Sequence, residues 1–308
     1  MERELISWLR KRLPPHPLLR LGPGDDAAVL RMAGINECVV TVDLLTDHVD
    51  FELAEIDPRR AGRKALAVNL SDLAAMASKP LAGVVALALP RHDGMNLAKA
   101  LYEGMLPLAQ QYDLAIAGGD TNSWDGPLAV SITLLGKVTD RGPLCRSGAR
   151  PGDRIVVTGS FGGSILGKHL DFEPRVDEAI DLHARYELHA GIDVSDGLSL
   201  DLAHILEESQ CGAILNADAI PIAAAARRLA EAAADGATPL EHALGDGEDF
   251  ELILAVPPET ARRMLVEQPL SVPLTDIGEF VAEPGLWMQT SGGNRRPLAP
   301  RGWEHNLE

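Results

Sequence analysis

Aspartates recur in this chain at the ends of apolar runs, where a carboxylate is difficult to accommodate. Residues 21–30 place Asp25 and Asp26 after two glycines and directly before a short apolar strand. Similar placements follow along the chain at Asp43, Asp72, Asp120, Asp193 and Asp196. A carboxylate beside an apolar interior is strongly destabilising unless a cation or solvent meets it. The recurring placements therefore predict a single shared cation site.

The expected ligands are oxygen atoms, because no histidine or cysteine stands at metal-ligand spacing beside these aspartates. Carboxylate oxygens suit hard cations, which favours Mg²⁺ over zinc. Ser195 lacks the strained elbow and the base of a hydrolase triad. Two classes stay open from the residues alone, a magnesium-dependent phosphoryl-transfer enzyme and a calcium or magnesium binding module without catalysis. Glycine-rich turns beside carboxylates favour nucleotide chemistry.

Composition limits the fold class and the kinds of partner. The 308 residues carry a formal net charge of −17, which argues against nucleic acid or an anionic membrane as a partner. The chain is long enough for about two domains. Aromatic residues make up only 4% of the chain, and Ala, Leu and Val fill the apolar positions. This composition suits helices packed on sheets, so we expect an α/β or α+β fold.

Cysteine use and hydropathy indicate the compartment. Three widely spaced cysteines predict neither a disulfide framework nor a thiolate zinc site. The first ten residues carry charges throughout and lack the apolar core of a signal peptide. No apolar run approaches membrane-spanning length. We therefore expect a cytoplasmic protein that is not bound to a membrane.

The first half of the chain alternates helical and strand patterns that would hold the aspartates. The Asp57-Pro58 pair is a helix start signal, and the helical pattern runs on to residues 79–80. Asn69, Ser71 and Asp72 are polar where this pattern should be apolar, and such violations tend to mark function. The other expected elements are helices over 2–13 and 96–112 and strands over 27–30, 38–45, 81–89 (buried), 114–117 (leading into Gly118–Thr121) and 128–138.

Around residues 146–153 the composition changes to Gly, Pro and charge, which places the boundary between domains 1–145 and 146–308. A strand over 154–158 leads into glycines at 159–163, a layout that can hold a phosphate on backbone amides. Residues 162–169 nearly match a P-loop, but His169 stands where Ser or Thr should hold magnesium. We expect helices over 198–209 and 222–234, and a turn at Glu248 and Asp249 before a strand that ends near residue 256.

Seven segments, taken together and in order, resemble the thiamine-monophosphate kinase family of the aminoimidazole ribonucleotide synthetase-like ATP-binding superfamily. They are residues 24–26, 41–43, 69–76, 118–121, 146–153, 192–198 and 247–252. Each segment is weak alone, but the set is specific because the related ATP-using synthetases share only parts of it. A catalytic cysteine near either end is absent, which counts against the selenophosphate and hydrogenase-maturation branches.

The resemblance implies a two-domain fold in which the strands of the N-terminal domain form a barrel across a homodimer, with a C-terminal α+β domain. ATP would lie between the domains. The implied reaction is direct in-line transfer of the γ-phosphoryl group of ATP to thiamine monophosphate, giving thiamine diphosphate, with several Mg²⁺ ions. Two alternatives remain, another ATP-dependent synthetase of the superfamily and a non-catalytic nucleotide-binding homologue.

The resemblance also assigns roles to individual residues. The implied metal ligands are Asp26, Thr41, Val42, Asp43, Asp72, Asp120, Asp193 and Asp196. Of these, Asp43, Asp72 and Asp120 would hold the ions that bridge the phosphates, and so would be catalytic. Val42 would act through its carbonyl, because the family usually has Thr there. Gly119, Asp120, Arg146 and Ser195 would contact ATP. Asp50, Glu248 and Trp303 would contact the acceptor, with Asp50 standing where the family usually has His.

Overall fold

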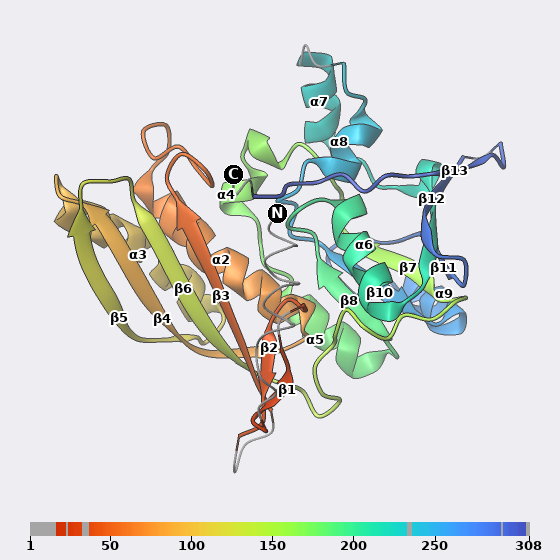
Figure 1. Cartoon of the computed structure of the whole chain (residues 1–308), viewed down its shortest axis with the longest axis horizontal. Coiled ribbons are helices and arrows are strands. Elements are labelled where there is room, and N and C mark those ends of the chain that lie inside the picture. Colours follow the sequence, from red (N-terminus) through yellow and green to blue (C-terminus); the bar gives the residue numbers. More distant parts are fainter. Residues whose placement is uncertain (1–16, 23, 33–36, 233–235, 291, 306–308) are drawn as a thin grey trace.

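The computed structural model describes residues 17–22, 24–32, 37–232, 236–290 and 292–305. Two sheets lie on either side of a long central helix, and the N-terminal sheet is on the left in Figure 1. The predicted helix over 2–13 falls outside the described residues. No helix in the described part of the chain is long and apolar enough to cross a bilayer.

The N-terminal sheet has six strands in the order β1-β2-β3-β6-β4-β5, and its neighbours are antiparallel except for β4 and β5. The strands are β1 (Leu19–Leu21), β2 (Ala28–Leu30), β3 (Cys38–Thr46), β4 (Lys79–Pro90), β5 (Ala115–Trp124) and β6 (Ala129–Lys137). Helices α2 (Pro58–Ala75) and α3 (Gly94–Gln111) cover one face (Figure 1). β1 and β5 do not pair with each other, so the sheet is open within the described chain and does not close into a barrel.

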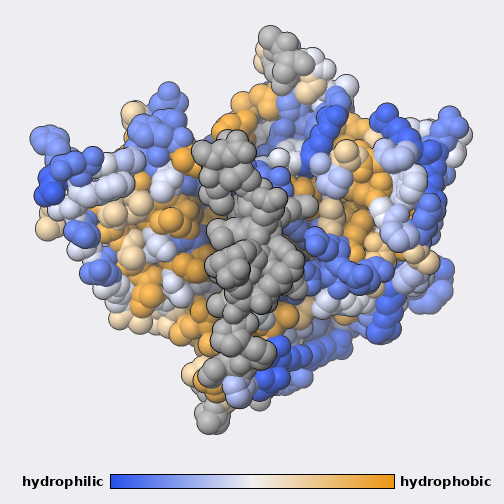
Figure 2. All heavy atoms as spheres, viewed as in Figure 1, coloured by the Kyte–Doolittle hydropathy of each residue, from blue (hydrophilic) through white to orange (hydrophobic). Residues whose placement is uncertain are grey.

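The other face of this sheet stays exposed among the described residues, and we call it the open face. Val42 is 61% exposed, Leu44 63% and Val84 45%. Figure 2 shows hydrophobic side chains gathered over this part of the molecule. A contiguous apolar surface of this kind usually marks an interaction site.

Two strand predictions need correction. β4 was expected to be buried on both faces because its sequence is apolar throughout, but its residues alternate between buried and exposed. The sequence cannot distinguish an apolar open face from a doubly buried strand. β5 continues through the segment 118–121 instead of ending before it, so Gly119 and Asp120 lie within a strand.

Helix α2 begins where the sequence predicted. The Asp57 carboxylate accepts a hydrogen bond from the Arg59 amide at 2.9 Å, and Pro58 occupies the first turn. The helix ends at Ala75, four residues before the expected stop at residue 79, because Ala77 adopts a left-handed φ of 47°. The Ser78 amide then donates to the Leu73 carbonyl at 2.8 Å, which closes the helix end.

The C-terminal sheet has seven strands in the order β13-β12-β9-β11-β7-β10-β8. They are β7 (Arg154–Thr158), β8 (Ala190–Asp193), β9 (Gly212–Asn216), β10 (Leu252–Val256), β11 (Leu274–Val281), β12 (Gly285–Gln289) and β13 (Arg295–Pro297). The helices are η1 (Ser164–Leu166), α4 (Lys168–Asp171), α5 (Val176–Arg185), α6 (Leu198–Ser209), η2 (Ala217–Ala219), α7 (Ala224–Ala232), α8 (Pro239–Gly245) and α9 (Pro258–Glu267). α6 has the predicted bounds, whereas α7 starts two residues after the predicted 222.

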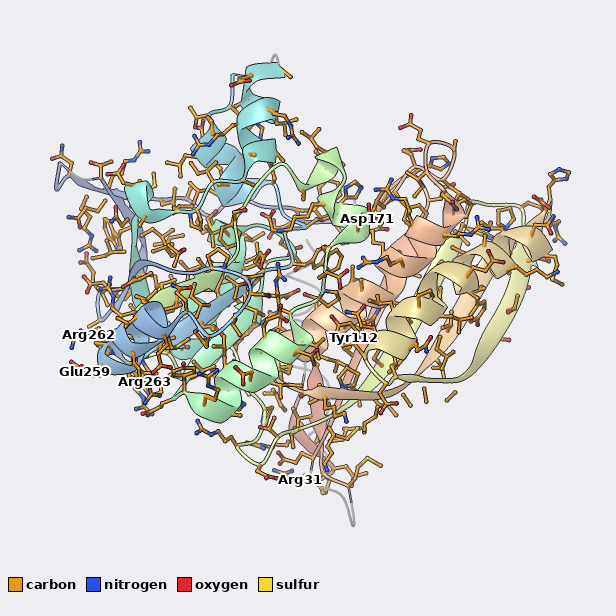
Figure 3. The ribbon with its side chains drawn as sticks, turned by 180° about the vertical axis from the view of Figure 1, so that it is seen from behind. Arg31, Tyr112, Asp171, Glu259, Arg262 and Arg263 are labelled. Carbon is orange, nitrogen blue, oxygen red and sulfur yellow. The ribbon has the colours of Figure 1, made fainter. Side chains whose placement is uncertain are left out.

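One hydrophobic cluster spans both domains, and a second lies within the C-terminal domain. Val156 of β7 and Leu254 of β10 belong to the same cluster as the apolar face of α2, and their strand neighbours face a second cluster with α6. The junction is also clamped by polar contacts, since the Tyr112 hydroxyl donates to the Pro174 carbonyl at 2.9 Å. Asp171 accepts from Arg60 Nε at 3.2 Å (Figure 3). α2 is therefore packed between the two sheets.

Candidate active site

Three carboxylates from different parts of the chain converge between the domains. Oxygen atoms of Asp26, Asp72 and Asp193 all lie within 4.8 Å of one another. Asp26 precedes β2, Asp72 lies in α2 and Asp193 ends β8. We call these three residues the acidic cluster. Asp193 is only 2% exposed, so water provides little screening of the charge there.

The polar interruption of α2 supports this cluster. Asn69 Oδ1 accepts a hydrogen bond from the Asp43 amide at 3.2 Å, which fixes β3 against the helix. The Ser71 hydroxyl donates to the Asp193 carboxylate. The polar residues that break the apolar pattern of α2 therefore meet groups of β3 and β8 at the site.

β3 places two more of the predicted ligands beside the cluster. The Thr41 hydroxyl donates to the Asp72 carboxylate, and Asp43 projects to the same side of the strand. Asp43 Oδ2 and Asp26 Oδ2 are buried and have no hydrogen-bond partner. Val42 lies between Thr41 and Asp43 in the sequence. Its side chain points to the open face, so only its carbonyl could be a ligand.

Burial raises the pKa values of Asp43 and Asp193. The pKa of Asp43 is raised to about 6 by burial and by the charges of Asp50 and Asp196. Burial, together with the charge of Asp26, raises the pKa of Asp193 to about 7. A divalent cation would favour their ionised forms and fill the unmatched oxygen positions. The donor set, which is all oxygen, fits Mg²⁺.

Arg146 lies at the edge of the acidic cluster. Its Nη2 donates to Asp26 Oδ1 at 2.6 Å, and its backbone amide donates to Asp25 Oδ2 at 3.1 Å. Arg146 Nε is buried without a hydrogen-bond partner. Burial, and then the neighbouring Asp26 charge, raise the pKa of Asp25 to about 7. The guanidinium thus has donor capacity left for an anion. Asp25, which the sequence placed beside Asp26 without a role of its own, supports the backbone of Arg146.

A cavity of 480 Å³ adjoins the cluster and is lined by both domains. Its lining includes Asp43, Asp50, Lys64, Ser195, Asp196, Glu248 and Trp303. The three predicted acceptor contacts and the predicted ATP contact Ser195 therefore meet in one place. Lys64 was not predicted, although a lysine within the largely apolar helix segment 61–67 is a signal that could have revealed it.

Several cavity residues are held by their own hydrogen bonds. Asp50 Oδ2 accepts from the Thr46 amide at 2.6 Å, so this carboxylate also closes its own loop. The Trp303 amide donates to the Asp196 carbonyl at 3.0 Å, which fixes the C-terminal segment against the cavity. The Glu248 carboxylate pairs with Lys64.

Gly119 and Asp120 lie away from these residues in the single chain. Asp43 is in register with Ile132 of β6, which pairs with Val85 of β4, which pairs with Gly119 of β5. Two strands lie between, so the separation is about 14 Å at the usual strand spacing. Asp120 is the next residue of β5 and points to the open face, opposite to Asp43.

The prediction that residues 159–163 hold a phosphate on their backbone amides is wrong. The Gly162 amide donates to Asp249 Oδ2 at 2.8 Å, and the Gly163 amide donates to Asp246 Oδ2 at 2.7 Å. These amides are therefore saturated by carboxylates of the chain itself, which the sequence pattern could not show.

Comparison with known proteins shows which protein family this chain resembles. Residues 24–138 match AIR synthase related protein, N-terminal domain, and residues 150–289 match AIR synthase related protein, C-terminal domain. A thiamine-monophosphate kinase of Rhodopirellula baltica is 44% identical over 312 residues, which cover 99% of this chain and 97% of that protein.

Solved structures agree over nearly the whole chain. One described as AaThiL complexed with AMPPCP and TMP superposes with a TM-score of 0.84 at 25% identity, covering 99% of this chain and 97% of the other. The thiamine-monophosphate kinase of Stenotrophomonas maltophilia gives a TM-score of 0.72 at 34% identity, covering 94% and 96%.

Proposed function

This chain belongs to the thiamine-monophosphate kinases, within the AIR synthase related proteins, and on that premise we propose that it transfers the γ-phosphoryl group of ATP directly, in line, to thiamine monophosphate. The products are ADP and thiamine diphosphate. The observation that carries this proposal is the acidic cluster beside a cavity lined by both domains. It offers cation ligands at one end and room for an organic acceptor at the other.

Asp26, Asp72 and Asp193 would hold several Mg²⁺ ions, with Asp43, Thr41 and Asp196 as neighbouring ligands. When bound, Mg²⁺ neutralises phosphate charge and orients the transferred group. The protein carries a net charge of −17 and must bring the polyphosphate of ATP and the phosphate of the acceptor together. Its own carboxylates can promote that approach only by recruiting cations.

The remaining cavity residues divide between the two substrates. Arg146 and Ser195 contact ATP, and the guanidinium supplies donors to its phosphates. Glu248 and Asp50 face the positively charged thiazolium of the acceptor. Trp303 stacks on that ring through a cation–aromatic contact.

The open face supports a homodimer. An exposed apolar sheet face and the unpaired edge of β5 are features that a second copy would cover. The two open sheets then complete a barrel. Because Asp120 points to that face, we propose that Gly119 and Asp120 of one subunit reach the ATP site of the other, and that each site is incomplete in a monomer.

Thiamine diphosphate formation tests the function. Purified protein with ATP, Mg²⁺ and thiamine monophosphate should form ADP and thiamine diphosphate, and a protein-free control should not. No product above the control would contradict the proposal. ATP consumption only with another acceptor would favour the alternative synthetase, and ATP binding without turnover would favour a non-catalytic homologue.

A further inference from the structure

Lys64 carries a positive charge where the fold excludes water. Its side chain is 1% exposed, and it lies on α2 beside the cavity. A buried ammonium is strongly destabilising unless it is paired. Its Nζ donates to the Asp50 carbonyl at 2.6 Å and to Oε1 of Glu248.

These two partners belong to different walls of the cavity. Asp50 lies in the loop after β3, in the N-terminal domain, and Glu248 lies in the turn before β10, in the C-terminal domain. Lys64, which lies on α2 between the two walls, therefore contacts both of them. Because it binds the backbone of one wall and the carboxylate of the other, it fixes their relative position.

The turn that carries Glu248 has a strained backbone, and hydrogen bonds to neighbouring segments hold it in place. Glu248 has a φ of 54° and Phe250 a φ of 50°, values that residues other than glycine rarely adopt. The Glu248 amide donates to the Ser195 carbonyl at 2.6 Å, and the Phe250 amide donates to the Val194 carbonyl at 2.8 Å. These bonds fix the main chain, and Lys64 fixes the carboxylate, whose side chain is 33% exposed.

We propose that Lys64 is a positioning residue that determines how the acceptor is bound. Its ammonium occupies Glu248 Oε1, so that Oε2 is the oxygen offered to the thiazolium ring of the acceptor. Without the ammonium, the Glu248 carboxylate loses its fixed orientation and the Asp50 loop loses its tie to α2. The proposal rests on the proposed function, because it assumes that thiamine monophosphate occupies this cavity.

The test compares Lys64→Met with the parent in the full-length protein. We expect the KM for thiamine monophosphate to rise about tenfold or more and the KM for ATP to stay within about twofold. Lys64→Gln, which keeps a polar donor and leaves fewer buried groups unpaired, should show the same split if the Met variant does not fold. The matched control is Arg154→Met, which removes a half-buried ion pair with Asp276 outside the cavity. It should leave both KM values unchanged.

A double variant shows whether Lys64 acts through Glu248. Adding Lys64→Met to Glu248→Gln should raise the acceptor KM by much less than it does in the parent, because coupled residues are not additive. Equal changes in both KM values, or a lower melting temperature with unchanged KM, would overturn the proposal.

Calorimetric titration with thiamine monophosphate separates this proposal from the proposed function. A parent that binds the acceptor tightly without turnover contradicts the kinase assignment, yet weaker binding by Lys64→Met still supports the role of Lys64. Equal affinity of the two proteins would overturn that role. A parent that does not bind the acceptor contradicts both proposals.

Discussion

Asp72 and Asp193 of the acidic cluster are ionised only with difficulty, and this determines how their variants should behave. Burial, and then the charges of Asp43 and Asp193, raise the pKa of Asp72 well above its usual value. In the folded protein without metal, the charged form of Asp72 is therefore unfavourable. Function and stability are expected to respond in opposite directions when this charge is removed.

Asp72→Asn should lower turnover by about 10² or more, because a loss of a few kcal/mol of transition-state stabilisation has that effect. The melting temperature of the metal-free protein should be unchanged or higher, since a neutral amide replaces a buried charge. Turnover and thermal unfolding are measured on the same samples. Asp177→Asn, at an exposed position of α5, is the control. A lower melting temperature with intact turnover would mean that Asp72 is purely structural.

Metal affinity should increase with pH. The pKa of Asp43 is raised to about 6 and that of Asp193 to about 7, so the folded protein holds protons there that the unfolded chain has lost. Without metal, stability therefore falls as pH rises from about 4 through 7. A bound cation displaces these protons, so affinity should gain up to about tenfold per pH unit for each proton displaced. Calorimetric titration with Mg²⁺ at pH 5.5, 6.5 and 7.5 checks this, and a constant affinity would contradict it.

At the scale of elements, the packing of α2 on α3 positions the site. The helices approach most closely at two glycines, where a side chain has no room. A Cβ on Gly104 would lie 1.8 Å from the Arg59 carbonyl oxygen, and one on Gly62 would lie 2.1 Å from that of Leu101. Any shift of α2 would carry the Asp72 carboxylate with it.

Gly104→Ala should therefore destabilise the protein by about 1 to 3 kcal/mol, the usual effect of overpacking. Urea unfolding measures the change, and Lys99→Ala, at an exposed position of the same helix, serves as the control. A destabilisation no larger than that of the control would show that α2 and α3 can move apart without lowering the free energy of unfolding.

The elements show what a single sequence can and cannot predict. The start of α2 at Pro58 and both ends of α6 were predictable, because caps and apolar periodicity are local signals. The sequence predicted one site for Asp26, Asp72 and Asp193 because each is a carboxylate beside an apolar run, but the same rule also included Asp120, which lies away from them in the single chain. The partners of the Gly162 and Gly163 amides were not predictable, because the carboxylates that bind them lie more than eighty residues away.

Asp120 shows a different limit of the sequence. Its motif indicates a phosphate site, but its strand places it on the open face, with two strands between it and Asp43. Residue types alone cannot show whether a ligand acts within its own chain or in a second copy. Answering that question requires the assembled protein.

A mixed dimer tests whether the sites are shared between subunits. Asp72→Asn and Asp120→Asn should each be nearly inactive as homodimers. A purified heterodimer of the two variants should regain about half of the parental turnover, because one of its two sites combines an intact Asp72 with the partner's intact Asp120. A heterodimer as inactive as the two variant homodimers would place Asp120 in the site of its own chain. Light scattering confirms that each sample is dimeric.

The most direct measurement of the proposed reaction follows the γ-phosphorus of ATP. The protein is incubated with γ-labelled ATP, Mg²⁺ and thiamine monophosphate, and the label is located in the separated products. Direct transfer predicts that the label appears in the terminal phosphate of thiamine diphosphate, mole for mole with ADP, and only when both Mg²⁺ and the acceptor are present. Label recovered as inorganic phosphate, with no labelled thiamine diphosphate, would contradict it.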